Sequence, residues 1–179
     1  MRIIGGRLNR RLIKPPSGLP VRPTTDKAKE ALFNILNNYV DFEDLIVLDL
    51  FSGTGSIAFE FASRNAVEVF AVDNNSKCVR FIKEVKKQFD LDNLTVLKTD
   101  AIRFLKNVKT PFDIIFCDPP YDMNGIEVIP DIVMTNSLLP PEGLLILEHT
   151  DSVRMDDHPS FMFKRNYSKV HFSFFSGKA

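Results

Sequence analysis

The sequence predicts one α/β domain built on a mostly parallel sheet of seven strands, with helices on both faces and an antiparallel hairpin at its C-terminus. Two observations support this fold class. Five short apolar runs alternate with segments of helical spacing, which is typical of parallel strands covered on both faces. The last two strands lie too close together for a crossover helix. A chain of 179 residues has the length of one domain.

The expected strands are apolar runs separated by turn signals: 46–51, 67–72, 94–97, 112–116 and 144–147, with the hairpin strands at 161–167 and 170–175. Expected helices follow the first four runs at 55–64, about 79–89, 102–105 and 126–136. A further helix is expected after Thr24-Thr25-Asp26, since these residues can cap it and apolar residues follow at helical spacing.

Composition excludes several classes of protein. Hydrophobic residues make up 44% of the chain and charged residues 26%, as in ordinary globular domains. No apolar run is long enough to cross a bilayer, and residues 1–6 have no signal-peptide core. Two cysteines, Cys78 and Cys117, are too few for a disulfide framework. We therefore expect a cytoplasmic, monomeric protein with no membrane partner.

The net charge of zero conceals an uneven distribution. Residues 164–179 hold four basic residues and no acid, whereas residues 26–163 hold 13 basic and 23 acidic residues. Residues 1–25 contain no acid, and we expect this segment to be a basic N-terminal arm that contacts a polyanion, ahead of a single domain at 26–179. A solvated, partly disordered N-terminus is the alternative. The arm's basic residues are Arg2, Arg7, Arg10, Arg11, Lys14 and Arg22.

A glycine turn follows the first expected strand and opens the next helix. Gly53 and Gly55 would let the backbone approach a ligand closely, and Asp73 ends the next strand about 20 residues later, where an acid can bind ribose hydroxyls. Gly53-x-Gly55-x-x-Ala58 also fits the dinucleotide fingerprint, so an NAD-dependent enzyme is one alternative. A tight turn that merely needs small residues is another.

Four acids fall at or near the ends of successive strands: Asp49, Asp73, Asp100 and Asp118. Asp100 could simply cap the helix that follows it, but four acids in successive units are hard to explain by capping. The carboxyl ends of parallel strands form the ligand edge of such sheets. Four carboxylates would repel a pyrophosphate and suit a ligand with positive charge and several donors. These properties favour S-adenosylmethionine over NAD.

The motifs Asp49-x-Phe51-x-Gly53-Thr54-Gly55 and Asp118-Pro119-Pro120-Tyr121 resemble those of Rossmann-like, class I amino-methyltransferases. Met1 to Gly6 and Arg22 to Asp26, followed by Glu30 to Asn34, narrow the resemblance to the bacterial small-subunit ribosomal RNA (guanine-N2)-methyltransferases, the RsmD family. The resemblance covers nearly the whole chain. It implies methyl transfer from S-adenosylmethionine to the N2 amine of a guanine in 16S ribosomal RNA or a small-subunit particle, with S-adenosylhomocysteine as product.

The resemblance also implies roles for individual residues. Gly53 and Gly55 would face the methionine part of the cofactor, Asp73 the ribose, and Asp100 and Ala101 the adenine. Ala58, where many relatives have glycine, and the bulky Phe59 and Phe61 depart from the family pattern. The full cofactor-binding set is expected to be Thr25, Asp49, Phe51, Ser52, Gly53, Thr54, Gly55, Asp73, Asn74, Asp100 and Ala101.

The segment from Asp118 to Tyr121 would hold the target amine. Asp118 and the Pro119 carbonyl can accept the amine hydrogens, Pro120 stiffens the turn, and Tyr121 can stack on the base. A stiff turn without chemistry is the alternative interpretation. Strand alternation predicts that Cys117 points away as a small core residue. His149, His158 and His171 lack ligand spacing, so no metal is expected.

Other function classes make different predictions. A DNA adenine-N6 methyltransferase shares the acceptor chemistry but usually carries a separate target-recognition region. A protein glutamine methyltransferase would more typically have Asn in place of Asp118. A non-catalytic RNA-binding module could retain the fold, but it would have no reason to keep the acidic edge together with Asp118-Pro-Pro-Tyr.

Overall fold

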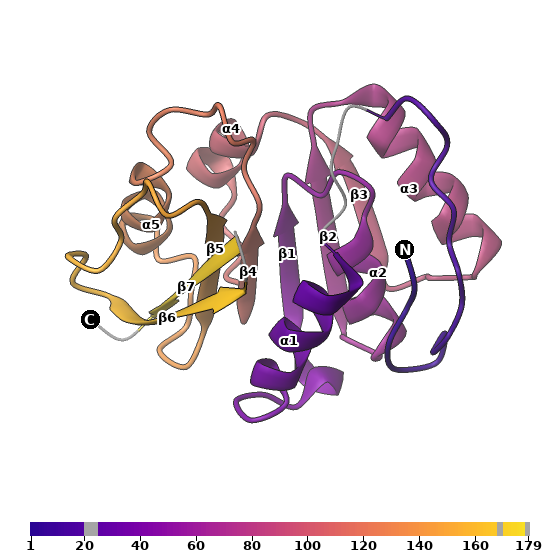
Figure 1. Ribbon diagram of the computed structural model, residues 1–179, viewed down its shortest axis with the longest axis horizontal. Helices are drawn as coiled ribbons and strands as arrows, with labels where there is room; N and C mark the ends of the chain where they lie inside the picture. Colours follow the sequence, from indigo (N-terminus) through magenta and orange to yellow (C-terminus); the bar gives the residue numbers. More distant parts are fainter. Residues whose placement is uncertain (20–24, 168–169, 178–179) are drawn as a thin grey trace.

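A computed structural model describes residues 1–19, 25–167 and 170–177. Its sheet has seven strands in the order β3-β2-β1-β4-β5-β7-β6 (Figure 1). The pairs among β1 to β5 are parallel, and β7 runs antiparallel to both β5 and β6. The predicted sheet and hairpin are therefore confirmed. The strands are β1 Ile46–Leu50, β2 Glu68–Asp73, β3 Leu94–Lys98, β4 Ile114–Cys117, β5 Leu144–His149, β6 Phe161–Tyr167 and β7 Val170–Ser176.

Helices cover both faces of the sheet, as predicted. Buried residues of α1, α2 and α3 share one core cluster with one face of the strands. Residues of α4 and α5 form a second cluster on the other face (Figure 1). The α-helices among the described residues are α1 Asp26–Leu36, α2 Ser56–Ser63, α3 Ser76–Gln88, α4 Ala101–Asn107 and α5 Val128–Thr135, and a 3-10 turn spans Phe42–Asp44.

Local chemistry sets where these elements begin and end. The Asn75 side chain accepts the N–H of Lys77 at 2.9 Å at the start of α3, and the Thr25 hydroxyl accepts the N–H of Ala28 at 3.2 Å at the start of α1. Strand β1 ends at Leu50, one residue earlier than predicted, because Phe51 adopts a left-handed backbone with φ +59°.

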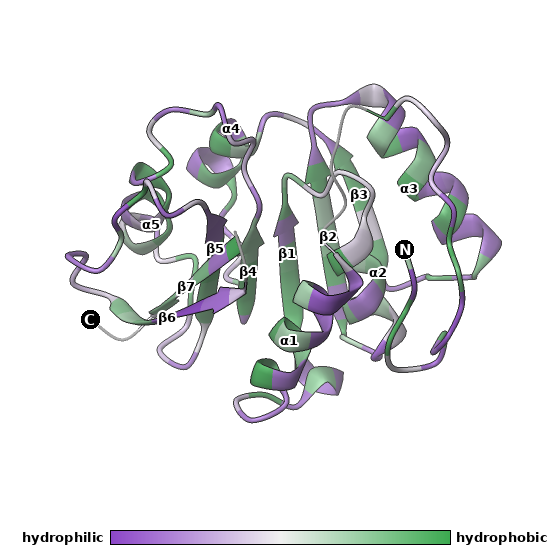
Figure 2. Cartoon of the chain, in the orientation of Figure 1, coloured by the Kyte–Doolittle hydropathy of each residue, from purple (hydrophilic) through white to green (hydrophobic). Residues whose placement is uncertain are grey.

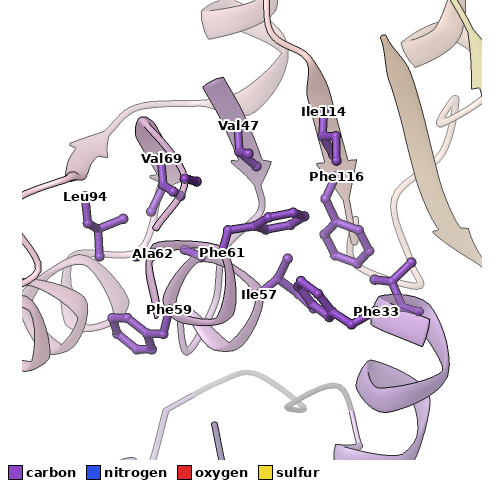
Figure 3. Packing of buried hydrophobic residues seen from close by; sticks show 14 of the residues in the cluster. Phe33, Val47, Ile57, Phe59, Phe61, Ala62, Val69, Leu94, Ile114 and Phe116 are labelled. Carbon is purple, nitrogen blue, oxygen red and sulfur yellow. The ribbon is translucent and has the colours of Figure 1, made fainter. Parts of the chain in front are cut away.

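An aromatic cluster joins α1 and α2 to the sheet. Phe33 of α1 and Phe61 of α2 have ring centroids 4.8 Å apart, and Phe42 stacks on Phe33 at 5.8 Å. Figure 3 shows Phe33 and Phe61 converging with Phe116 of β4. Phe59 and Phe61, the bulky departures from the family pattern, are both fully buried. The hydropathy colours in Figure 2 show the matching division: central strands are apolar and β6 at the sheet edge is polar.

Residues 1–13 form a hairpin that packs against the end of α2. Arg2 and Leu12 are bridged, and the apolar side chains of Ile3, Leu8 and Ile13 are buried in the core. The Ser63 hydroxyl donates to the Gly5 carbonyl at 2.7 Å and accepts the N–H of Leu8 at 2.9 Å. The first half of the expected arm is therefore an integral part of the domain.

A buried ionic network fastens this hairpin to the domain. The Glu60 carboxylate of α2 accepts the N–H of Ile4 at 2.9 Å and the Nε–H of Arg64 at 3.1 Å. The Lys29 ammonium of α1 lies 3.5 Å from the same carboxylate and donates to the Arg2 carbonyl at 2.6 Å. Lys29 and Glu60 are fully buried, so each charge has the partners that burial requires.

Candidate active site

The loop after β1 is fixed by bonds to both neighbouring elements. The Ser52 hydroxyl donates to the carbonyls of Asp49 at 2.7 Å and Val72 at 3.1 Å. The Asp49 carboxylate, 2% exposed, accepts the N–H of Ala58 at 3.0 Å. Burial raises the pKa of Asp49 well above its ordinary value. Asp49 thus anchors the loop to α2 from inside the core.

Gly53 and Gly55 both have left-handed backbones, with φ of +52° and +75°. A Cβ at Gly55 would lie 3.0 Å from the side chains of Ile82 and Phe59, so a larger residue there would require these side chains to shift. The loop therefore turns sharply, and α2 begins directly after Gly55.

Asp73 connects this loop to the end of β2. Its carboxylate accepts the N–H of Gly53 at 2.8 Å and the N–H of Asn75 at 2.7 Å, and the residue is 8% exposed. A carboxylate oxygen can accept a second hydrogen bond. Asp73 can therefore hold the glycine loop in place and still accept a hydroxyl donor from a ligand.

A cavity of ≈ 470 Å³ lies beside the end of β2, lined by Gly18 and residues 74–77. Asn74, predicted to bind the cofactor, lines this space together with Gly18 of the N-terminal segment, and its role stays a prediction. Asp100 is exposed and accepts the N–H of Arg103 at 2.8 Å, so it caps α4, the structural role weighed from sequence. Ala101, which follows it, is buried.

The Asp118 segment lies next to the glycine loop because β4 pairs with β1. Leu50 pairs with Cys117, and the N–H of Asp118 points to the Leu50 carbonyl at 3.4 Å. Asp118 is half-buried, and burial raises the pKa of its carboxyl to about 7. Pro119 is buried, whereas the exposed Pro120 accepts the N–H of Met123 at 2.9 Å and closes the turn. Tyr121 is 58% exposed.

Cys117 is buried in the core cluster that contains residues of α4 and α5, which confirms the prediction that it is a core residue. Burial, with added effects of the Asp49 and Asp118 charges, raises the pKa of its thiol well above the ordinary value. A nucleophilic thiolate is therefore disfavoured at this position. Among residues 1–19, 25–167 and 170–177, no group of three or more metal-ligating side chains occurs.

Glu148 near the end of β5 is the residue that sequence reasoning missed. Leu147 pairs with Cys117, so Glu148 follows in register with Asp118 on the neighbouring strand. It is 3% exposed, and its Oε2 has no hydrogen-bond partner among the described residues. Burial and then the nearby Asp118 charge raise the pKa of Glu148 to about 8. The sequence does contain a signal for this residue, because Glu148 directly follows the apolar run 144–147 of a predicted strand.

The predicted RNA-binding residues among those described all belong to the N-terminal segment. Arg2, Arg10, Arg11 and Lys14 are exposed on the N-terminal segment. Arg7 donates to the carbonyls of Phe89 and Asp90, at 2.9 and 3.0 Å. These carbonyls follow the end of α3, on the connection to the edge strand β3. Arg22 falls outside the described residues.

A second basic surface was missed because its residues come from two elements. A groove of ≈ 390 Å³ lies between α3 and β3. Arg80, Lys83 and Lys87 recur at helical spacing along one side of α3, and Lys98 comes from β3. Glu84 is the single acid among the described residues that line the groove. Four cations thus line a space that could hold an anion.

No helix among the described residues is both long and apolar enough to span a membrane.

The residues present fit S-adenosylmethionine. The Ser56 hydroxyl at the start of α2 is buried and has no partner among the described residues, so a polar ligand group could satisfy it. The Asp73 carboxylate offers acceptors for ribose hydroxyls, and the cavity beside Asn74 offers space for the sugar. The sheet order, with one antiparallel strand inserted near its end, and the acidic carboxyl edge together define a class I methyltransferase fold.

Comparisons identify the family. The model for the family described as conserved hypothetical protein 95 matches residues 1–176. The Bacillus subtilis protein YlbH, a putative rRNA methyltransferase, is 32% identical over 88% of this chain and 86% of its own length. The ribosomal RNA small subunit methyltransferase D of Escherichia coli is 30% identical over 83% of this chain and 74% of its own length. The chain therefore belongs to this family, the RsmD family.

Solved structures agree with the fold. The structure of Escherichia coli YhhF superposes with a TM-score of 0.86 at 27% identity, covering 100% of this chain and 98% of that chain. A coclaurine N-methyltransferase bound to S-adenosylhomocysteine superposes with a TM-score of 0.57 at 25% identity, covering 71% of this chain and 36% of that chain.

Proposed function

We propose that the protein transfers a methyl group from S-adenosylmethionine to the exocyclic N2 amine of a guanine in small-subunit ribosomal RNA and releases S-adenosylhomocysteine. The observation that carries this proposal is the position of Asp118. Asp118 is half-buried and comes directly before the Pro-Pro-Tyr turn, which lies beside the glycine loop because β4 pairs with β1. Membership of the RsmD family supports ribosomal RNA as the substrate.

The chemistry requires an amine made more nucleophilic than it is in free guanine, where its lone pair is delocalised into the ring. Asp118 and the Pro119 carbonyl would accept its two hydrogens and direct the lone pair toward the methyl group. Acceptors fixed before the reaction stabilise positive charge that develops on nitrogen, and each 1.4 kcal/mol or so gives about tenfold in rate. The bonded Pro120 turn supplies that rigidity.

The cofactor would lie across the ends of β1 and β2. Gly53 and Gly55 would border its methionine part, and the unpartnered Ser56 hydroxyl and the N–H groups of α2 would meet its carboxylate. Asp73 would accept the ribose hydroxyls. S-adenosylmethionine supplies an electrophilic methyl group on a sulfonium; the chain supplies its orientation relative to Asp118.

The target base would have to be unpaired or flipped out, since Asp118 is only partly exposed. Tyr121 would stack on the base, an interaction worth roughly 1–3 kcal/mol. RNA phosphates would be held by the exposed arginines of the N-terminal hairpin and by the basic groove of α3. Phosphate contacts supply affinity and orientation with little sequence information.

The test is methyl transfer from labelled donor to ribosomal RNA that lacks the modification, followed by nucleoside analysis. We expect labelled N2-methylguanosine. Asp118→Ala should lower turnover by about 10²–10³-fold, as for loss of one preorganised transition-state contact, while cofactor affinity stays within error. N6-methyladenosine as product would instead support the adenine alternative. Near-full activity of the variant would exclude the role given to Asp118.

The two basic surfaces are separable by charge reversal. Deleting the hairpin would also remove Ile3, Leu8 and Ile13 from the core, so point variants are the better test. Arg10→Glu with Arg11→Glu and Lys83→Glu with Lys87→Glu should each weaken RNA binding and flatten its salt dependence, by about one unit of slope for each phosphate that is no longer bound. Lys106→Glu, exposed on α4, is the control. A surface whose reversal leaves the slope unchanged does not bind RNA.

A further inference from the structure

Two carboxylates lie side by side where the target amine would bind. Asp118 follows β4 and Glu148 lies near the end of β5, in the same register of two paired parallel strands. Side chains alternate along a strand, and Phe116 and Ile146, two residues earlier on each strand, lie in the same core cluster. Asp118 and Glu148 therefore project from the same face of the sheet.

The surroundings of the pair contain no compensating cation among the described residues. Neither carboxylate takes part in an ion pair there, and Lys29, the buried ammonium of α1, is already bonded to Glu60 and Arg2. On β1, next to β4, the nearby titratable group is another buried acid, Asp49, which is also affected by the charge of Asp73 on β2. On β4 itself, the nearby titratable group is the thiol of Cys117, whose raised pKa keeps it neutral.

Further titratable neighbours among the described residues lie on the β5–β7 pair. Phe172 of β7 stands opposite Glu148. His149 and His171, one residue along each strand, stack on each other at 5.9 Å and bond elsewhere, His149 to Ser173 and His171 to Asn166, each at 2.7 Å. Burial lowers the pKa of His149, which favours the neutral ring. The polar contacts of both histidine rings within the described part of the chain thus go to groups other than Asp118 and Glu148.

A half-buried carboxylate and a buried one that lie side by side, with no cation beside them among the described residues, cannot both ionise cheaply near neutral pH. The pKa values of about 7 for Asp118 and about 8 for Glu148 reflect this. Negative charge is less costly on the more exposed group, and Asp118 is half-buried whereas Glu148 is 3% exposed. When the pair holds one proton and one negative charge, the proton therefore lies on Glu148 and the charge on Asp118.

We propose that Glu148 is a positioning residue that holds a proton beside Asp118, so that Asp118 alone carries the negative charge that receives the amine hydrogens. This rests on the proposed function. In the transfer, the N–C bond forms as the S–C bond breaks, and the electron pair of that bond stays on sulfur. The amine then loses one hydrogen as a proton to the Asp118 carboxylate. Glu148 keeps its own proton, and Asp118, the more exposed acid, returns its proton to solvent.

The first test needs no activity, so it is independent of the proposed function. The carboxyl carbons of ¹³C-labelled protein are titrated by NMR, and the Glu148 signal is assigned by its absence in Glu148→Gln. We expect it to titrate near pH 8 in the native protein. In Asp118→Asn its midpoint should move down toward the ordinary glutamate value, because the neighbouring charge is gone. A Glu148 signal that already titrates in the ordinary range, or that Asp118→Asn does not move, overturns the proposal.

The second test is the pH dependence of turnover. Below pH 7 the rate should fall by about tenfold per pH unit as Asp118 takes up a proton. Above pH 8 it should fall again, because ionised Glu148 repels Asp118 from the amine. Glu148→Gln mimics the protonated acid, so it should retain turnover at pH 7 within about threefold, a loss no larger than that of one neutral hydrogen bond, and lose the alkaline fall.

Glu127→Gln, an exposed change on the approach to α5, should leave both limbs in place. If Glu148→Gln is as inactive as Asp118→Asn while binding cofactor normally, the ionised form of Glu148 is required and the proposal is wrong. If native protein and Asp118→Asn both lack methyl transfer while the NMR coupling is present, the proposed function fails and the proton-sharing pair stands.

Discussion

Glu60 and Glu148 are both buried glutamates, and they differ in what surrounds them. Glu60 in α2 is fully enclosed, and its carboxylate binds the N–H of Ile4, the Nε–H of Arg64 and the ammonium of Lys29. Glu148 in β5 is 3% exposed, and one carboxylate oxygen has no partner among the described residues. The charge that acts on it is that of another acid, Asp118.

The difference shows that burial alone does not give an acid its role. Because its partners are cationic groups and an N–H, the Glu60 carboxylate links α1, α2 and the N-terminal hairpin. The absence of such partners at Glu148, among the residues described, leaves a group that is costly to ionise, and this property is useful only next to a reacting site. Three changes can break or sharpen this contrast.

The largest effect should follow removal of the Glu60 charge. Glu60→Gln leaves the ammonium of Lys29 buried without its anionic partner, which typically costs about 3–5 kcal/mol of unfolding free energy. The pKa of Lys29 is already lowered by burial, although Glu60 opposes this, so the variant should shift that pKa down further. Urea unfolding at pH 7 measures the loss.

Two further variants make the result interpretable. Glu30→Gln changes an exposed acid next to Lys29 on α1 and should alter stability by less than about 0.5 kcal/mol. Lys29→Met combined with Glu60→Met removes both charges and should recover most of the loss. If the double variant is no more stable than Glu60→Gln, the network is not held together by its charges.

Glu148→Gln should act in the opposite direction and only at higher pH. A carboxyl whose pKa is raised on folding stabilises the native state fully below its ordinary value, and this contribution is lost as pH rises through the folded value. For Glu148 that window runs from 4.5 to about 8. Relative to Glu148→Gln, the native protein should lose up to about 1.4 kcal/mol per pH unit across it.

Urea unfolding at several pH values between 5 and 9 checks this, and only the pH dependence matters, since the new amide adds a constant term. Glu60→Gln provides the comparison: at alkaline pH it should lower the unfolding free energy relative to the native protein, whereas Glu148→Gln should raise it. A stability difference between the native protein and Glu148→Gln that stays constant with pH would mean that Glu148 titrates alike in the folded and unfolded chain.

The same contrast explains how far the sequence could be interpreted. The apolar strands and the glycine turn were predictable because each signal lies within one short segment, and the role expected of Asp118 stays a prediction. The partners of Glu60 come from Ile4, Lys29 and Arg64, which are brought together only by folding. Glu148 escaped notice because its significance depends on the neighbour that β4 supplies.

The N-terminal segment shows the same limit. Its cations suggested an arm, yet Ile3, Leu8 and Ile13 lie between them and are buried. Their spacing has neither the period of a strand nor that of a helix, because the segment turns back on itself through Gly6 and Arg10, both with left-handed backbones. Periodicity reveals regular elements, and this hairpin has only an isolated bridge.

The smallest expected effect tests how the hairpin is seated beside Glu60. Gly6 has φ +70°, and a Cβ there would collide with the backbone carbonyl of Ser63. Gly125 has φ +76°, but a Cβ there would meet nothing within 4 Å. Gly6→Ala should therefore cost about 2–3 kcal/mol and Gly125→Ala only about 1–2 kcal/mol, the strain of a left-handed alanine alone.

A double variant links this change to the Glu60 network. Gly6→Ala and Glu60→Gln both loosen the hairpin from α2, so their combined loss of unfolding free energy should be smaller than the sum of the single losses. Gly125→Ala with Glu60→Gln should be additive, because the two sites lie in separate parts of the fold. Additive losses in both pairs would show that Glu60 stabilises α1 and α2 without holding the hairpin.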